Sequence, residues 1–134
     1  MKYFEERSDC KIMTINYDDL SKQIMDSEPQ IRFAAIANSK GELIAGGQKN
    51  SVEKILANDE INMSIHYALQ KRDLYTNLAY KIGRERYSIT EYEKVTMISI
   101  PINSQELFLI STEPKADYFT IIDNVYSILD SERF

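Results

Sequence analysis

Hydrophobic positions along the chain follow strand-like spacing in some segments and helical spacing in others, which predicts a mixed α/β domain. Residues 31–47, IRFAAIANSKGELIAGG, are the most informative segment. They predict two strands joined by a tight turn over Asn38–Gly41, in which asparagine favours turn initiation and glycine supplies backbone freedom. The first strand, Ile31–Ala37, is apolar at nearly every position, so we expect both of its faces to be covered. The second strand is predicted over Leu43–Ala45, with Gly46-Gly47 breaking it.

Helical spacing predicts an amphipathic first helix, a long central helix and a final helix. The first is expected over Tyr17–Ser27, with Asn16 as its N-cap and Pro29 beyond its end. One or two helical turns are expected over 51–57, before the long helix. The long helix is expected to be capped by Asn58 or Asp59 and to run to about Ile82, with Gly83 as its C-terminal stop. The final helix is expected to have Pro114 in its first turn and to end near Asp130.

Three further strands are predicted between the long and final helices. Arg86–Tyr92 is polar and alternating, as suits an edge strand, whereas Val95–Ile102 and Glu106–Ser111 carry apolar residues on both faces. Short turns within each group of strands imply antiparallel pairing. The element order therefore predicts an α/β (α+β) fold, with helices on both faces of one five-stranded antiparallel sheet.

The long helix has more apolar circumference than packing on one sheet requires. One stripe holds Met63, Tyr67, Leu74 and Leu78, and a second holds Ile61, Ala68, Tyr75, Ala79 and Ile82. A second neighbour is therefore expected, either another subunit or another part of the same chain, such as the N-terminal arm. A homodimer is predicted through the long helix and the edge strand that follows it, where tyrosines gather. The predicted dimer interface comprises Met63, Tyr67, Leu74, Tyr75, Leu78, Tyr87 and Ile89.

The order of elements, the phrase IRFAAIANSKGELIAGG, and EYEKVTMISIPI followed by LFLIST resemble the roadblock (dynein light-chain-like) domain. This domain is a branch of the profilin-like and longin-like folds. The chain most resembles small roadblock-like proteins of ammonia-oxidising archaea, in which a hairpin ending in IAGG and a Tyr-Glu-Lys before the fourth strand recur. The resemblance implies a single roadblock-like domain over residues 16–134. Residues 1–15 are left as an N-terminal arm or a short helix.

The resemblance also implies a function, because roadblock domains form dimers and several act as scaffolds or regulators of small GTPases. The expected function is therefore a non-enzymatic dimeric interaction module, with a small GTPase or another signalling protein as its partner. The alternative is a small-molecule sensor of the PAS or profilin-like type, which would need a pocket with convergent polar groups. The sheet-facing residues that can be assigned from the sequence are large and apolar, which favours a filled core over such a pocket.

Acidic residues are concentrated at both ends of the chain. The net charge is −5, and residues 1–30 and 113–134 each carry −3. In a roadblock-like arrangement the first and last helices share one face of the sheet, so this face would be acidic and free for a cationic partner. The predicted partner-binding residues are Asp117, Asp123 and Asp130, although the same charges could serve only solubility. Nucleic-acid binding is not expected without clustered Lys and Arg.

Few residues could take part in catalysis or ligand binding, and they form no catalytic, cofactor or metal motif. Cys10 is the only cysteine and His66 the only histidine, too few for a zinc site. His66 could pair with Asp73 through water or simply be exposed. Gly46–Lys49 could cradle a phosphate or simply end a strand, and Lys81–Arg86 could bind a partner or complement a helix end. The short apolar runs and charged N-terminus predict a cytoplasmic protein without membrane insertion.

Overall fold

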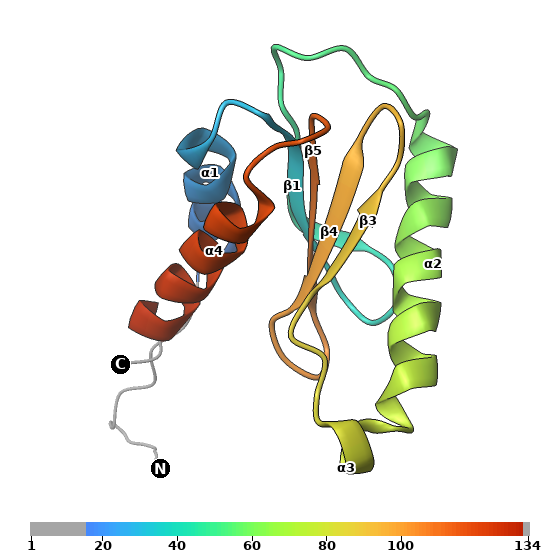
Figure 1. Cartoon of the computed structure of the whole chain (residues 1–134). Coiled ribbons are helices and arrows are strands. Elements are labelled where there is room, and N and C mark those ends of the chain that lie inside the picture. Colours follow the sequence, from blue (N-terminus) through green and yellow to red (C-terminus); the bar gives the residue numbers. More distant parts are fainter. Residues whose placement is uncertain (1–15, 133–134) are drawn as a thin grey trace.

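The computed structural model describes residues 16–132, which form one antiparallel sheet with helices on both faces (Figure 1). The predicted N-terminal arm and Cys10 lie outside these residues. The elements are α1 (Tyr17–Ser27), β1 (Ile31–Ala37), β2 (Leu43–Gln48), α2 (Asn58–Thr76), α3 (Ala79–Ile82), β3 (Ser88–Glu91), β4 (Thr96–Pro101), β5 (Leu107–Thr112) and α4 (Tyr118–Glu132). The strand order is β2-β1-β5-β4-β3, and every neighbouring pair is antiparallel. The predicted fold class is confirmed.

The hydrophobic core lies between the sheet and the α1/α4 layer. α1 packs against β1, β2 and α4, and Figure 1 shows α1 and α4 together on the face opposite α2. Alternate residues of the central strands fill this side, including Ile98, Ile100, Phe108 and Ile110. The long helix and the first and last helices therefore cover opposite faces, as expected.

β2 continues through the two glycines that were predicted to break it. Gly46 pairs with Ala35 and Gly47 pairs with Ala34, so the ladder extends to Gln48. Gly46 has φ +81°, and a Cβ there would collide with the carbonyl oxygen of Ala34. The strand thus keeps its pairing because glycine permits a backbone bend at this position.

The predicted long helix is divided into α2 and α3. The α2 helix ends at Thr76, whose hydroxyl donates to the carbonyl of Arg72. A hydrogen bond from the Leu78 amide to the Tyr75 carbonyl, which spans three residues instead of four, closes the last turn. Threonine and asparagine compete for backbone hydrogen bonds, which explains a helix end at 76–77. Gly83, with φ +88°, does end α3.

Three other local predictions were wrong. Residues 51–57 form no helical turn and are an irregular connection. The N-cap of α2 is Ala57, whose amide donates to the Glu60 carboxylate at 2.9 Å, rather than Asn58 or Asp59. Pro114 lies in a turn before α4, which begins at Tyr118 because Asp117 caps it by accepting from the amide and hydroxyl of Thr120.

Candidate functional site

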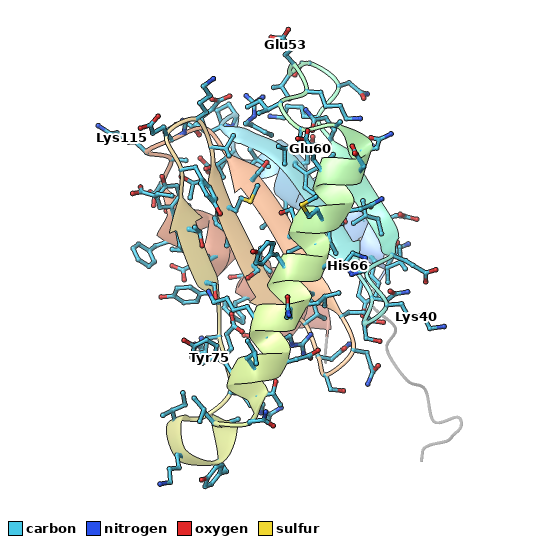
Figure 2. All side chains as sticks on the ribbon, turned by 90° about the vertical axis from the view of Figure 1, so that its right-hand side faces the viewer. Lys40, Glu53, Glu60, His66, Tyr75 and Lys115 are labelled. Atoms are coloured by element: carbon cyan, nitrogen blue, oxygen red, sulfur yellow. The ribbon has the colours of Figure 1, made fainter. Side chains whose placement is uncertain are left out.

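The outward side of α2 carries an apolar stripe that nothing in residues 16–132 covers. Ile65 is the only fully buried residue of this helix. We call Met63, Tyr67 and Leu74 on α2, together with Leu78 just beyond its end, the outer stripe; their exposed fractions are 62%, 72%, 65% and 46%. Tyr75 is 53% exposed and lies on the side of α2 nearer β3 (Figure 2). Large contiguous apolar surface of this kind marks an interaction site in soluble proteins.

The inward side of α2 is attached to the sheet mainly by polar contacts. Arg72 donates to the carbonyls of Asn103 and Glu106 in the β4–β5 turn. The Ser64 hydroxyl lies 3.7 Å from the Met97 sulfur. The His66 ring covers Gly41 in the β1–β2 turn, where an added Cβ would lie 2.5 Å from its Cε1 atom (Figure 2). His66 and Asp73 are both exposed, and their pairing through water stays a prediction.

A groove of about 600 Å³ separates the first half of α2 from the sheet. Ile61, Ser64, Ile65 and Ala68 form its helix side. Its floor includes the hydroxyl residues Ser88, Thr90, Ser99 and Ser111 from β3, β4 and β5. The expectation of a filled core holds for the α1/α4 side of the sheet and is wrong for the α2 side. We call this cavity the α2 groove.

The predicted interface residues Ile89, in β3, and Tyr87, just before β3, lie toward the α1/α4 side of the sheet. Ile89 packs partly buried against the core on the α1/α4 side. Tyr87 makes an edge-on contact with Phe119 of α4, with ring centroids 6.3 Å apart, and is 37% exposed. The structure therefore brings Met63, Tyr67, Leu74 and Leu78 together but places Tyr87 and Ile89 on the other side of the sheet edge.

The three predicted partner-binding carboxylates are exposed on or beside α4. Asp117 caps the helix, while Asp123 and Asp130 lie along it. Exposed Asp18, Asp19 and Asp26 belong to α1, which packs beside α4. Arg86 also reaches this face, because its guanidinium lies 4.9 Å from the ring centroid of Tyr126. The predicted basic segment 81–86 is thus partly packed against α4.

A polar network at the β4–β5 turn connects α1 to α2. The Tyr17 hydroxyl donates to the Glu106 carboxylate at 2.7 Å, and the Asn103 side-chain amide donates to the same oxygen. Burial, followed by the adjacent Glu106, raises the pKa of Tyr17 to about 12. Because Arg72 donates to backbone carbonyls of the same turn, helices on opposite faces of the sheet meet at one loop.

The proposed phosphate loop is part of the β2 ladder in this structure. Gly46, Gly47 and Gln48 pair with β1, and the Lys49 amine donates to the Pro29 carbonyl at 3.2 Å. Within the described part of the chain, no three His, Cys, Asp or Glu side chains are grouped so that they could hold a metal ion. None of its helices combines the length and apolar character needed to span a bilayer.

The comparisons with known proteins agree with this architecture. Residues 9–132 match the model of DUF6659, a family of unknown function. The chain belongs to this family. Among curated proteins, none matches the sequence.

Solved structures similar to this DUF6659 protein include roadblock domains and a profilin. A Roadblock/LC7 domain from Streptomyces avermitilis has a TM-score of 0.67 and 14% identity, covering 89% of this chain and 96% of that chain. The gliding protein MglB from Thermus thermophilus has a TM-score of 0.69 and 10% identity, covering 92% and 96%. Profilin II from Acanthamoeba castellanii has a TM-score of 0.54 and 13% identity, covering 87% and 95%. At these identities the likeness shows a shared roadblock and profilin-like fold.

Proposed function

We propose that this protein is a non-enzymatic interaction module that works as a homodimer. The observation that carries the proposal is the outer stripe of α2, because its four large side chains are between 46% and 72% exposed in the single chain. Two copies can cover both stripes by packing α2 beside α2 about a twofold axis, which makes the same residues meet on each side. β3, which forms one edge of the sheet, would lie near that axis.

The partner of the dimer is proposed to be a small GTPase or another signalling protein. The likeness to roadblock domains supports this class of partner, and one of the similar structures is of MglB in a tetrameric arrangement, an assembly of that protein. The α1/α4 face stays free in the proposed dimer because it lies on the opposite side of the sheet from α2. Its exposed carboxylates at Asp117, Asp123 and Asp130 suit a cationic partner surface.

The dimer is tested with Leu74→Asp. Burying a whole leucine side chain is worth about 1.5–3 kcal/mol, so covering the 65% of Leu74 that is exposed contributes about 1–2 kcal/mol. Because a twofold dimer contains the residue twice, losing it costs about 2–4 kcal/mol, which weakens dimerisation about 30- to 1000-fold. The charge of aspartate adds to this loss.

Sedimentation over a range of protein concentrations measures the dimer directly. We expect the unmodified chain to sediment as a dimer at micromolar concentration and Leu74→Asp as a monomer with unchanged circular dichroism. Ile44→Asp is the matched control, because Ile44 is 43% exposed but lies on β2, at the other edge of the sheet. A monomeric unmodified chain, or equal dissociation by both variants, would refute the proposed interface.

A further inference from the structure

We infer that the α2 groove is a binding site for a small, uncharged, amphipathic organic molecule. This inference goes beyond the proposed dimer and does not depend on it. The groove volume of about 600 Å³ falls within the range of about 300–1,000 Å³ typical of small-molecule pockets. Two of the four outer-stripe residues, Met63 and Tyr67, also line the groove, whereas Leu74 and Leu78 do not.

The groove floor differs in chemistry from the opposite face of the same strands. Ser88 is paired with Ser99 across β3 and β4, and Met97 is flanked by Thr90 and Ser111. Two adjacent cross-strand rows thus present hydroxyls toward α2, whereas Ile98, Ile100, Phe108 and Ile110 face α1 and α4. Within residues 16–132, the side-chain hydroxyls of Thr90, Ser99 and Ser111 form no hydrogen bond. They remain available to a ligand as donors or acceptors.

The charged side chains that border the groove either form an ion pair, as Arg32 does, or lie exposed at its rim, as Glu60 and Lys71 do. Arg32 forms a 2.6 Å ion pair with Glu113, and Glu60 accepts from the Ala57 amide at the start of α2. Lys71 donates at 3.3 Å to Ser88, which in turn donates to a carboxylate oxygen of Glu85. A charged group inside the mostly apolar groove would lose its hydration with no unpaired, buried counter-charge among the lining residues, at a large desolvation cost. The ligand is therefore uncharged and mostly apolar, with a few polar atoms that reach the floor hydroxyls of Thr90, Ser99 and Ser111.

The groove suits neither a helix nor an added strand as its occupant. A helix with side chains is about 10 Å wide, so about 8 Å of its length, roughly a turn and a half, would already fill 600 Å³. An added strand has no ladder to join, because the floor is the face of the sheet and β4 and β5 are paired on both sides. In the proposed dimer, a second copy contacts the outer stripe, of which only Met63 and Tyr67 line the groove.

The test uses two fluorescent probes of nearly equal shape and different charge. Phenylnaphthylamine is neutral, and anilinonaphthalenesulfonate carries a sulfonate. We expect the full chain to bind about one neutral probe with enhanced fluorescence, and to bind the anionic probe at least about tenfold more weakly. Equal or tighter binding of the anionic probe would overturn the assignment of an uncharged ligand.

Groove-filling variants locate the bound probe. Ser99→Leu from the sheet and Ala68→Leu from α2 should each weaken binding of the neutral probe at least about tenfold. Ser127→Leu makes the same change as Ser99→Leu at an exposed site on α4, on the other face of the sheet, and should leave binding unchanged. Unchanged binding by either correctly folded filling variant would overturn the site. Circular dichroism checks folding, and Ala68→Leu decides the test if Ser99→Leu does not fold.

One further variant separates this inference from the proposed dimer. Leu74→Asp changes the outer stripe and should leave binding of the neutral probe within about twofold of the unmodified chain. Loss of the probe in Leu74→Asp would place it on the stripe and overturn the groove site. A chain that sediments as a monomer but binds the probe as expected would refute the dimer and support the groove.

Discussion

Replacing Gly46 by alanine probes the closest approach between the sheet and α1. Gly46 has φ +81°, and a Cβ there would collide with the Ala34 carbonyl oxygen, while lying 2.8 Å from the Ala35 Cα and 2.9 Å from the Ser21 hydroxyl oxygen. Ser21 is itself buried, at 2% exposure, and its hydroxyl has no hydrogen-bond partner among the described residues. Small residues at these positions let α1 approach β1 and β2 closely, so a methyl group has no free space.

The cost of Gly46→Ala can be built from two contributions. A non-glycine residue in the left-handed region costs about 1–2 kcal/mol. Forcing a methyl group into a packed site costs about 1–3 kcal/mol more. Alanine also lowers the conformational entropy of the unfolded chain, which reduces the destabilisation by about 0.4–1 kcal/mol. The expected destabilisation is therefore about 2–4 kcal/mol, a large part of the roughly 5–15 kcal/mol typical of a folded domain.

Urea unfolding at one fixed protein concentration, followed by circular dichroism, measures this difference. Gly47→Ala is the matched control, because Gly47 also has a positive φ, +156°, and pays a backbone cost, but nothing lies within 4 Å of a Cβ there. We expect Gly46→Ala to cost about 1–3 kcal/mol more than Gly47→Ala, which is the cost of the collision. Ser21→Gly combined with Gly46→Ala should recover only a small part of the loss, since the main collision is with backbone. Equal free energies of unfolding for the Gly46 and Gly47 variants, or full recovery in the double variant, would refute the reasoning.

Two further predictions concern the surface network and the acidic face. Because the pKa of Tyr17 is raised from 10.0 to about 12, its contribution to stability is complete below pH 10 and is lost as the pH rises toward 12; Tyr17→Phe should flatten this part of the pH–stability curve. Subtracting the absorbance titration of Tyr17→Phe from that of the unmodified chain should leave the titration of one phenol, which ionises near pH 12. A difference curve centred near pH 10 would contradict the burial of Tyr17. Changing Asp117, Asp123 and Asp130 together to asparagine should leave the dimer mass unchanged and α4 capped, since asparagine caps as well as aspartate. The same variant should reduce the low-salt recovery of cationic partner proteins from native extracts; recovery that is unaffected by both the substitutions and the ionic strength would show that these carboxylates only solvate the surface.

Local sequence patterns were sufficient to predict the elements whose hydrophobic periodicity and capping signals are strong. The limits of α1 and β1 were predicted to the residue, because Asn16 caps the helix and the apolar run Ile31–Ala37 ends at a turn signal. The antiparallel sheet followed from short turns between strands. The outer stripe was also predicted, because the 3.6-residue period of a helix places these side chains on one face. That placement does not depend on whether another element packs on the face.

The distances between these elements, and the side chains that fill the space between them, could not be predicted without the packing of the whole domain. β2 continues through Gly46 because α1 and β1 approach it closely, although the same glycines considered alone indicate a strand end. The hydroxyls of Ser99 and Ser111 look like ordinary strand residues until pairing places them in adjacent rows beneath a helix that touches the sheet sparsely. Tyr17 and Arg72 both bind Glu106 in the β4–β5 turn because the fold brings α1 and α2 to the same end of the sheet. Periodicity describes one element at a time, whereas a groove, a close approach or a shared loop depends on the packing of several elements together.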